Sequence, residues 1–378
     1  MTEHEAYVAF NMAPDVGSVK VAELAKEHGG VVAAWEAFPE KTDWEGKPID
    51  WRREMERAEK MHVTIVTCDD SRYPAALGDL PSKPLALYVA GKPDALAAPG
   101  VAVVGTRLPT LYGTDMAERF AVGIAKGGLS VISGLAAGID AEAHKGALAA
   151  GGVTVGVLGG ALDRFFPEEN RELGRRIVAA GGAVASEYPF GFPPGKKTFP
   201  QRNRIVAALA RGVLAVEAPA QSGTLITCDF AKKLGRAVMA IPANLDSKNS
   251  FGCWRLIREG AAMVTSPEEV VSISLEFRVS SSELRVPSSE FRVDAQPGTR
   301  NPKPGTSNPK LQASNPKPTE LTIEEAAVLR AIPSTGITLD LLAFRTKLPA
   351  AAVSTATMSL RIKGMIRFLP GNRVAPAK

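Results

Sequence analysis

Short apolar runs alternate with amphipathic segments between residues 101 and 264. The apolar runs are rich in Val, Ile, Leu, Ala and Gly, the composition of strands that are covered on both faces of a sheet. Such alternation is typical of an α/β fold built on a parallel sheet. Strands are predicted at residues 101–106, 129–134, 153–159, 183–186, 212–217, 237–241 and 262–264, and helices at residues 110–126, 139–149, 169–180, 202–210, 225–234 and 254–258.

Residues 1–60 form a predicted helical domain that precedes this sheet. Pro14–Gly17 predicts a turn, and Ser18 predicts the cap of the following helix. A helix, a tight Gly turn and a second helix resemble a helix-hairpin-helix unit, which offers N–H groups to DNA phosphates. Only Lys20 lies near the turn, so a plain helical bundle is the favoured interpretation. Its core is expected to contain three tryptophans, Trp35, Trp44 and Trp51.

Residues 61–272 form the second predicted domain, which begins with two strands at 62–74 and 85–91 and continues into the alternating region. Residues 273–320 repeat every seven residues and are rich in Ser and Pro. This composition predicts a disordered linker, because it cannot bury enough apolar surface to offset the entropy of ordering. Its prolines exclude a coiled coil.

Residues 321–378 form the last predicted domain, with three helices and a hairpin that turns at 370–372. Thr322 and Glu325 match a capping box at the first helix. This order of elements predicts a winged helix. Its third helix begins with small apolar side chains, whereas a helix that reads a DNA groove carries polar ones early. A protein-contact or auxiliary role is therefore favoured for this domain.

Composition limits the class of protein. The net charge of +5 is compatible with nucleic-acid binding but does not require it, so the position of the charge matters more than its sum. The three cysteines lie far apart, which indicates neither a disulfide framework nor a zinc site and fits a cytoplasmic protein. We expect no signal peptide, no membrane span, no metal and no cofactor.

The segment from Glu187 to Glu217 has no acidic residue between these two ends. Its first half is rich in Pro and Gly and predicts a loop, which leads into a helix and then a buried strand. Basic side chains neutralise phosphates, and an aromatic ring stacks on a base. A solvated basic loop with a core phenylalanine explains the pattern equally well. The basic residues of this segment are Lys196, Lys197, Arg202, Arg204 and Arg211, and its aromatic residues among them are Phe192 and Phe199.

Several catalytic chemistries fit the sequence poorly. Arg107 stands where a dinucleotide turn needs small residues, and residues 191–198 contain two prolines where a phosphate loop must donate N–H groups. Asp140 and His144 lie four residues apart on one helix face and could form a general base, although a structural pair is favoured because no nucleophile is evident. Residues 222–224 could cap a helix, hold a phosphate, or do both.

An ordered series of motifs resembles the DNA processing protein A (DprA/Smf) family. The series includes VVGTR, SGLAAGIDAEAH, FPQRNRIVAAL and VEAPAQSGTLIT. The matching segments are residues 73–74, 103–107, 112–113, 133–144, 156–170, 186–191, 199–209, 216–227, 235–244 and 256–261.

The resemblance implies an extended Rossmann-like core, with an N-terminal SAM/helix-hairpin-helix-like domain and a C-terminal winged helix. It implies a homodimer without catalytic activity that binds and protects single-stranded DNA and loads RecA recombinase in transformation and repair. The alternative is a nucleotide-hydrolysing, phosphoribohydrolase-like enzyme on the same scaffold, whose Pro-Gly-Gly-x-Gly-Thr motif and downstream Glu are missing here. The resemblance and the basic segment together predict a DNA site at Gly105, Thr106, Arg107, Ser133, Gly134, Lys196, Lys197, Phe199, Arg202, Asn203, Arg204, Ser222, Gly223 and Thr224.

Overall fold

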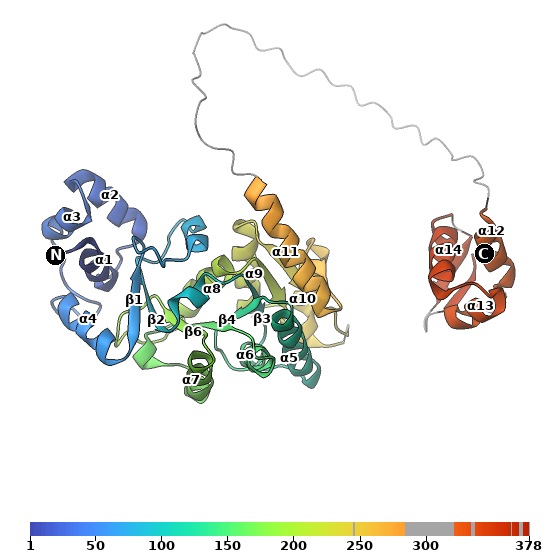
Figure 1. Cartoon of the computed structure of the whole chain (residues 1–378), viewed down its shortest axis with the longest axis horizontal. Helices are drawn as coiled ribbons and strands as arrows, with labels where there is room; N and C mark the ends of the chain where they lie inside the picture. Colours follow the sequence, from blue (N-terminus) through green and yellow to red (C-terminus); the bar gives the residue numbers. More distant parts are fainter. Residues whose placement is uncertain (245, 284–320, 334–336, 364, 370–372, 378) are drawn as a thin grey trace, which may run out of the picture. The chain divides into compact units, whose positions relative to one another are not determined.

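The chain divides into two compact units, Met1–Glu290 and Phe291–Lys378 (Figure 1). The structure is a computed structural model that describes residues 1–378 except 245, 284–320, 334–336, 364, 370–372 and 378. Among the helices that it describes, none combines the length and the apolar character needed to cross a bilayer.

The first unit is built on a nine-stranded sheet with the order β1-β2-β6-β5-β4-β3-β7-β8-β9. The strands from β3 to β9 run parallel, whereas β1 and β2 form an antiparallel edge beside β6. The mainly parallel α/β sheet predicted from the apolar runs is therefore confirmed. The strands are β1 (Val63–Thr67), β2 (Ala86–Gly91), β3 (Gly100–Val104), β4 (Ser130–Ser133), β5 (Thr154–Val157), β6 (Ala183–Ser186), β7 (Gly212–Ala215), β8 (Ala237–Ala240) and β9 (Ala262–Met263).

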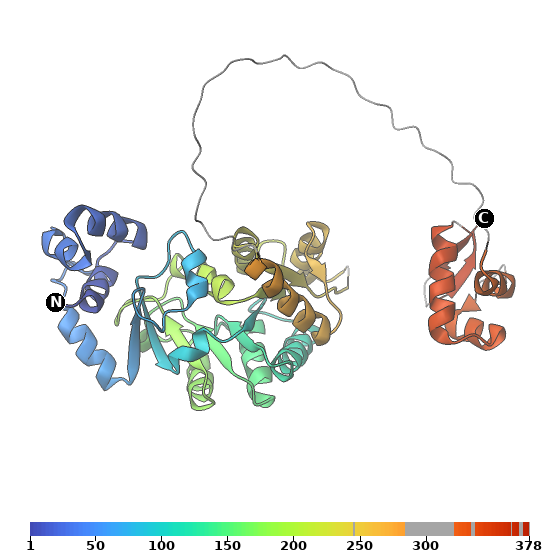
Figure 2. The same cartoon turned by 45° about the horizontal axis from the view of Figure 1, so that its top comes forward.

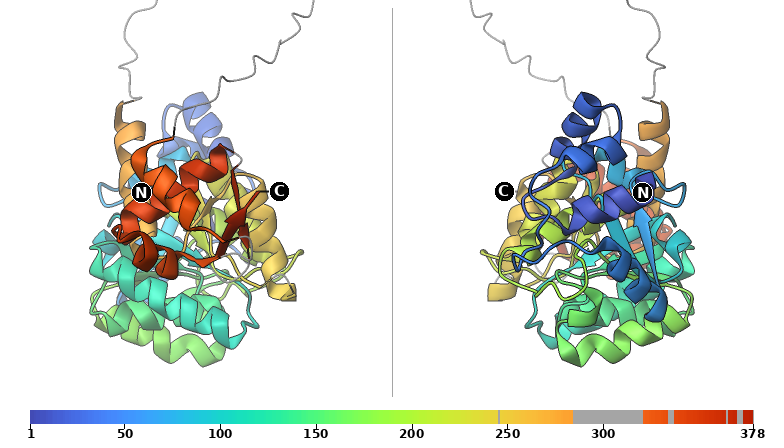
Figure 3. Two further views of the ribbon diagram at one scale, coloured as in Figure 1. Left: turned by 90° about the vertical axis from the view of Figure 1, so that its right-hand side faces the viewer. Right: turned by 90° about the vertical axis from the view of Figure 1, so that its left-hand side faces the viewer.

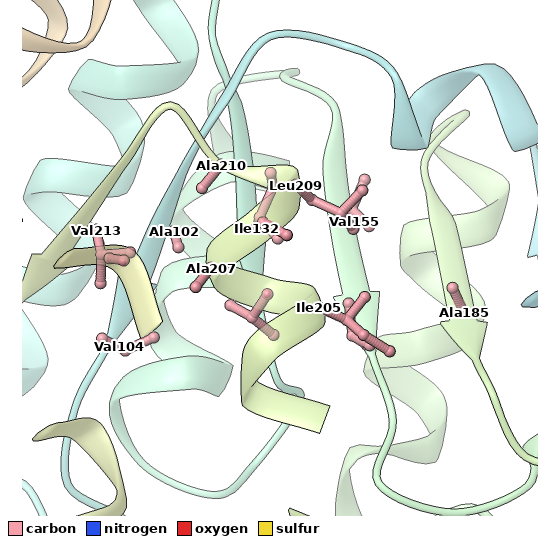
Figure 4. Packing of buried hydrophobic residues seen from close by; sticks show 14 of the residues in the cluster. Ala102, Val104, Ile132, Val155, Ala185, Ile205, Ala207, Leu209, Ala210 and Val213 are labelled. Atoms are coloured by element: carbon pink, nitrogen blue, oxygen red, sulfur yellow. The ribbon is translucent and has the colours of Figure 1, made fainter. Parts of the chain in front are cut away.

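Helices cover both faces of this sheet, as the apolar strands require. One face packs against α8, α9 and α10, where Ile205 and Leu209 of α8 lie among Ile132 and Val155 of the strands (Figure 4). The other face packs against α5, α6, α7 and α11. These helices are α5 (Leu111–Lys126), α6 (Ile139–Ala149), α7 (Arg171–Ala179), α8 (Thr198–Leu209), α9 (Gly223–Lys233), α10 (Phe251–Arg258) and α11 (Pro267–Glu283).

Four further helices precede the sheet and lie beyond its β1 edge (Figures 1 and 3). Phe10, Trp35 and Phe38 form their aromatic core, with the rings of Phe10 and Trp35 5.0 Å apart. Two details differ from prediction: Gly17 rather than Ser18 is the helix cap, and Trp44 packs on the ring of Phe192 instead of the helical core. The helices are α1 (Glu3–Met12), α2 (Ser18–His28), α3 (Val31–Ala37) and α4 (Trp51–Lys60).

Two helix boundaries also differ from the sequence prediction. Helix α8 begins at Thr198 rather than Arg202, because the Thr198 hydroxyl bonds to the backbone of both Gly195 and Gly159 and fixes the first turn. Helix α11 continues through Glu283, into the segment predicted as a linker from residue 273. The rest of that predicted linker lies outside the described residues.

The second unit, drawn in red in Figure 2, has its own hydrophobic core, which includes Val328, Leu342, Val353 and Leu360. The predicted capping box of Thr322 is present. The strands form a three-stranded sheet in the order β10-β12-β11, and the predicted turn at 370–372 lies outside the described residues. The elements are α12 (Ile323–Ala331), β10 (Ile337–Thr338), α13 (Leu339–Thr346), α14 (Ala350–Ile362), β11 (Ile366–Leu369) and β12 (Arg373–Pro376).

Candidate nucleic-acid interface

A cleft opens at the carboxyl ends of the central strands of the first unit. Strand β3 pairs with β4 on one side and β7 on the other, so the strand order reverses there, and α/β sheets bind ligands at such a point. The cleft has a volume of about 480 Å³. Eleven of the predicted site residues line it, namely Gly105, Thr106, Arg107, Gly134, Lys196, Phe199, Arg202, Asn203, Ser222, Gly223 and Thr224.

Phe199, in the first turn of α8, places an aromatic ring close to two other side chains. The guanidinium carbon of Arg107 lies 5.1 Å from the centre of the ring, and the ring of Phe166 lies 5.8 Å away on a tilted plane. A side chain at Gly159 would meet the Phe199 ring at 2.7 Å, so only glycine fits beneath it. The three side chains also line a smaller cavity of about 170 Å³.

Phe166 was not among the predicted site residues. It is 48 % exposed and follows β5, in a loop that the sequence places at the carboxyl end of the sheet. Two consecutive phenylalanines, Phe165 and Phe166, in such a loop are the sequence signal that could have identified it.

The two lysines before α8 differ in position although both are exposed. Lys196 lines the cleft, whereas Lys197 does not. The geometry thus favours Lys196 over Lys197, and DNA contact by either lysine stays a prediction.

Arg202 and Asp140 form the floor of the cleft, and both are more than nine-tenths buried. Nη1 of Arg202 donates to the Val157 carbonyl at 2.9 Å, and Oδ2 of Asp140 accepts from the Gly134 amide at 3.0 Å. Burial raises the pKa of Asp140 and lowers that of Arg202. Arg202 thus joins α8 to the end of β5, and Asp140 joins α6 to the loop after β4.

His144 lies fully buried in α6. The Thr154 hydroxyl donates to the Val131 carbonyl at 2.7 Å, so it accepts from Nδ1 of His144, also at 2.7 Å. Burial, and then the nearby charge of Arg202, lower the pKa of His144 to about 3. Asp140 and His144 thus bond to different partners, so the predicted pair between them is wrong. The buried ring cannot reach a substrate, which leaves His144 a structural role.

Two further predicted site residues are not among the described residues that line the cleft. The Ser133 hydroxyl is buried and donates to the Val103 carbonyl at 2.6 Å. Arg204 forms an ion pair with Glu187 in which both side chains are largely buried. Both side chains thus already bond within the sheet domain. DNA contact by either residue stays a prediction.

The start of α9 forms the opposite wall of the cleft. Ser222 is the helix cap, and its hydroxyl accepts from the Thr224 amide at 3.2 Å. The Asn203 amide donates to the Gly223 carbonyl at 3.3 Å, which joins α8 to this turn. The predicted cap is confirmed, and free N–H groups at a helix start also favour an anion.

The cleft thus combines cations, one aromatic ring and a helix start, with few side chains suited to catalysis. Asp140 is the single carboxylate among the described residues that line it. Within the described parts of the chain, no three His, Cys, Asp or Glu side chains gather closely enough to hold a metal ion. Such a surface suits an anion that carries a flat ring.

Comparisons with known proteins agree with this arrangement. The family model of DNA recombination-mediator protein A matches residues 64–274, and that of the DprA winged helix domain matches residues 312–372. The chain is 36 % identical over 289 residues to protein Smf of Synechocystis sp., covering 72 % of each chain.

Two solved structures are also similar. DNA processing protein A of Streptococcus pneumoniae has a TM-score of 0.60 and 34 % identity, over 72 % of this chain and 98 % of that one. The protein of the same name from Helicobacter pylori, which binds single-stranded DNA, has a TM-score of 0.51 and 29 % identity, over 57 % of this chain and 97 % of that one. With more than half of its length matched by the family model, the chain belongs to the DNA recombination-mediator protein A family.

Proposed function

We propose that the cleft binds single-stranded DNA and does not catalyse a reaction. The observation that carries this proposal is the meeting of Arg107 with Lys196 and Phe199, from two segments far apart in the sequence, around one cleft. The cations can neutralise neighbouring phosphates while the ring stacks on an unpaired base. Single-strand binding by the Helicobacter pylori relative supports the same polymer.

The same chemistry predicts that the ring of Phe199 does not stack on the bases of intact duplex DNA. A base offers its face to Phe199 only when it is unstacked, and a duplex must first be opened for that. We therefore expect the cleft to prefer single strands over duplex DNA of equal length.

The alternative, a nucleotide-hydrolysing enzyme, finds no support in the cleft. Asp140, the candidate base, is 7 % exposed and already accepts a backbone hydrogen bond from Gly134. A general base must reach the proton that it removes. Release of base from nucleoside monophosphates by the purified protein would favour the enzyme instead.

The proposal also includes a role in recombination. Membership of the family supports a cytoplasmic homodimer that shields single strands and loads RecA recombinase onto them. Light scattering tests the dimer, and the rate of RecA filament formation on protein-coated single strands tests the loading.

The decisive experiment measures binding of fluorescent single strands over a range of salt concentrations. Phe199→Ala is expected to weaken binding by about 1–3 kcal/mol on every sequence, since stacking tolerates all bases. Phe199→Tyr, which keeps the ring, is the matched control and should bind normally. Lys196→Glu should also reduce the dependence on salt. Unchanged affinity in both Phe199→Ala and Lys196→Glu would refute the site.

A further inference from the structure

The winged-helix domain, residues 321–378, carries the whole excess charge of the chain. Residues 321–378 contain eight Lys and Arg against three Asp and Glu, whereas residues 1–320 contain 37 of each kind. The formal charge of +5 therefore comes from the last domain alone. A small domain with this imbalance attracts polyanions.

Part of this charge gathers on one surface, the turn between α13 and α14. Arg345 and Lys347 are both exposed there, and together with Ala343, Leu348 and Pro349 they line an open hollow. No acidic side chain occurs among the described residues that line this hollow. We call it the turn hollow.

The two basic side chains of the turn hollow do not stabilise the fold through ion pairs with other described residues. Neither Arg345 nor Lys347 forms an ion pair with another described residue, whereas Lys363 of the same unit pairs with Glu325 at 2.6 Å across the domain. The positive charge of the turn hollow is therefore available to a partner.

Lys347 occupies a backbone position that does not favour lysine. Its φ of 55° places it in the left-handed region, at the C-cap of α13. Glycine or asparagine is preferred at such a position, because a Cβ atom is disfavoured there. A lysine that folding does not favour points to a role for its side chain.

We propose that the turn hollow binds the phosphate backbone of DNA without regard to sequence, as a second contact in addition to the cleft. We do not propose that the domain recognises base sequence. A helix that reads a DNA groove carries polar side chains early, whereas α14 begins with the apolar run Ala350–Val353. The inference depends on the proposed function only for the identity of the polymer. Single-stranded and duplex DNA share the phosphate chemistry, and the experiment separates them.

The test uses the full chain and measures DNA affinity against salt, with one oligonucleotide as a single strand and as a duplex. The double variant Arg345→Gln/Lys347→Gln removes two phosphate contacts. The slope of log affinity against log salt should fall in magnitude by about 1.4 on the single strand or about 1.8 on the duplex. The form of DNA that shows the fall is the one that the turn hollow binds.

Two controls separate a local site from other causes. Lys26→Gln/Lys60→Gln makes the same change of charge on exposed side chains of α2 and α4 and should leave both slopes unchanged. Lys347→Gly suits the left-handed position, so it should keep or raise the melting temperature while still lowering the slope. Poor folding then cannot explain a loss of binding.

The inference is overturned if the Arg345→Gln/Lys347→Gln protein has the slopes of the parent on both forms of DNA, which would leave an acidic protein as the partner. It is also overturned if the lysine control lowers the slopes equally. The cleft is judged separately. Loss of binding in Phe199→Ala with no effect at the turn hollow rejects this inference alone, and the reverse result rejects the proposed function of the cleft alone.

Discussion

Charged side chains have different roles on the floor and on the rim of the cleft. On the floor, Arg202 and Asp140 are more than nine-tenths buried and bond to the backbone of β5 and of the loop after β4. On the rim, Arg107 lies against an aromatic ring, and Lys196 is exposed to solvent. The sequence motif that contains Arg202 therefore stabilises the shape of the cleft, whereas the rim carries the side chains that we propose contact DNA.

This difference shows why a basic segment cannot be interpreted from its charge alone. A buried charge whose partner is removed destabilises the protein strongly, whereas removal of an exposed charge changes stability little. Substitutions on the floor should therefore change folding, and substitutions on the rim should change affinity with folding intact.

The largest expected effect is a loss of stability, caused by adding a methyl group at Gly134 beside Arg202 on the floor of the cleft. A Cβ atom at Gly134 would lie 1.4 Å from Nη1 of Arg202, so Gly134→Ala must displace the guanidinium from the Val157 carbonyl. We expect a loss of about 3 kcal/mol in unfolding free energy, because a buried charge is left without its partner. Urea unfolding measures this loss.

Gly195→Ala is the matched control, since a Cβ atom there meets nothing within 4 Å, and it should unfold like the parent. If Gly134→Ala kept full stability and lost only DNA binding, Arg202 would belong to the binding surface, and the distinction between floor and rim would fail.

The next expected effect is a loss of stability at low pH, caused by the buried His144 of α6. The pKa of His144 is about 3 in the folded protein and near 6.5 when unfolded, so the unfolded state binds more protons between these values. The stability from the neutral ring is present above about pH 6.5 and is lost as the pH falls toward 3. Between pH 7 and pH 5 this loss is about 2 kcal/mol.

Urea unfolding of the parent and of His144→Asn at both pH values measures this contribution. The variant cannot gain a proton at this position, so its stability should depend less on pH. An equal dependence in both proteins would mean that the ring can be charged where it lies.

The smallest effect distinguishes two neighbours on the rim. Lys196→Gln should lower the salt slope of single-strand binding by about 0.7, the share of one phosphate contact. Lys197→Gln should leave the slope unchanged, because this side chain does not line the cleft. Both proteins should unfold like the parent. Equal slopes in the two variants would show that the rim extends beyond the cleft.

The sequence predicted the sheet well because its strands are short apolar runs with strong turn signals between them. Helix α6, at Ile139–Ala149, and strand β6, at Ala183–Ser186, have the predicted limits. The start of α8 was missed because it depends on bonds of Thr198 to loops distant in sequence, which no local pattern shows.

The site could be predicted only in part, for a similar reason. Motifs identify the segments that converge at the carboxyl ends of the strands, but burial of a side chain depends on tertiary packing. Arg202 and Arg204 both appear basic and accessible in the sequence, yet one lies against Gly134 and the other pairs with Glu187. Phe166 was overlooked because its partner Phe199 lies on another segment.

Photocrosslinking of a single strand that contains 5-iododeoxyuridine tests the central claim most directly, because it locates the bound base without changing the protein. After irradiation and digestion, mass spectrometry identifies the residues joined to the DNA. We predict adducts at Phe199 or at neighbouring residues that line the cleft. Adducts confined to segments outside the cleft, under conditions where the strand is fully bound, would contradict the claim that this rim holds the DNA.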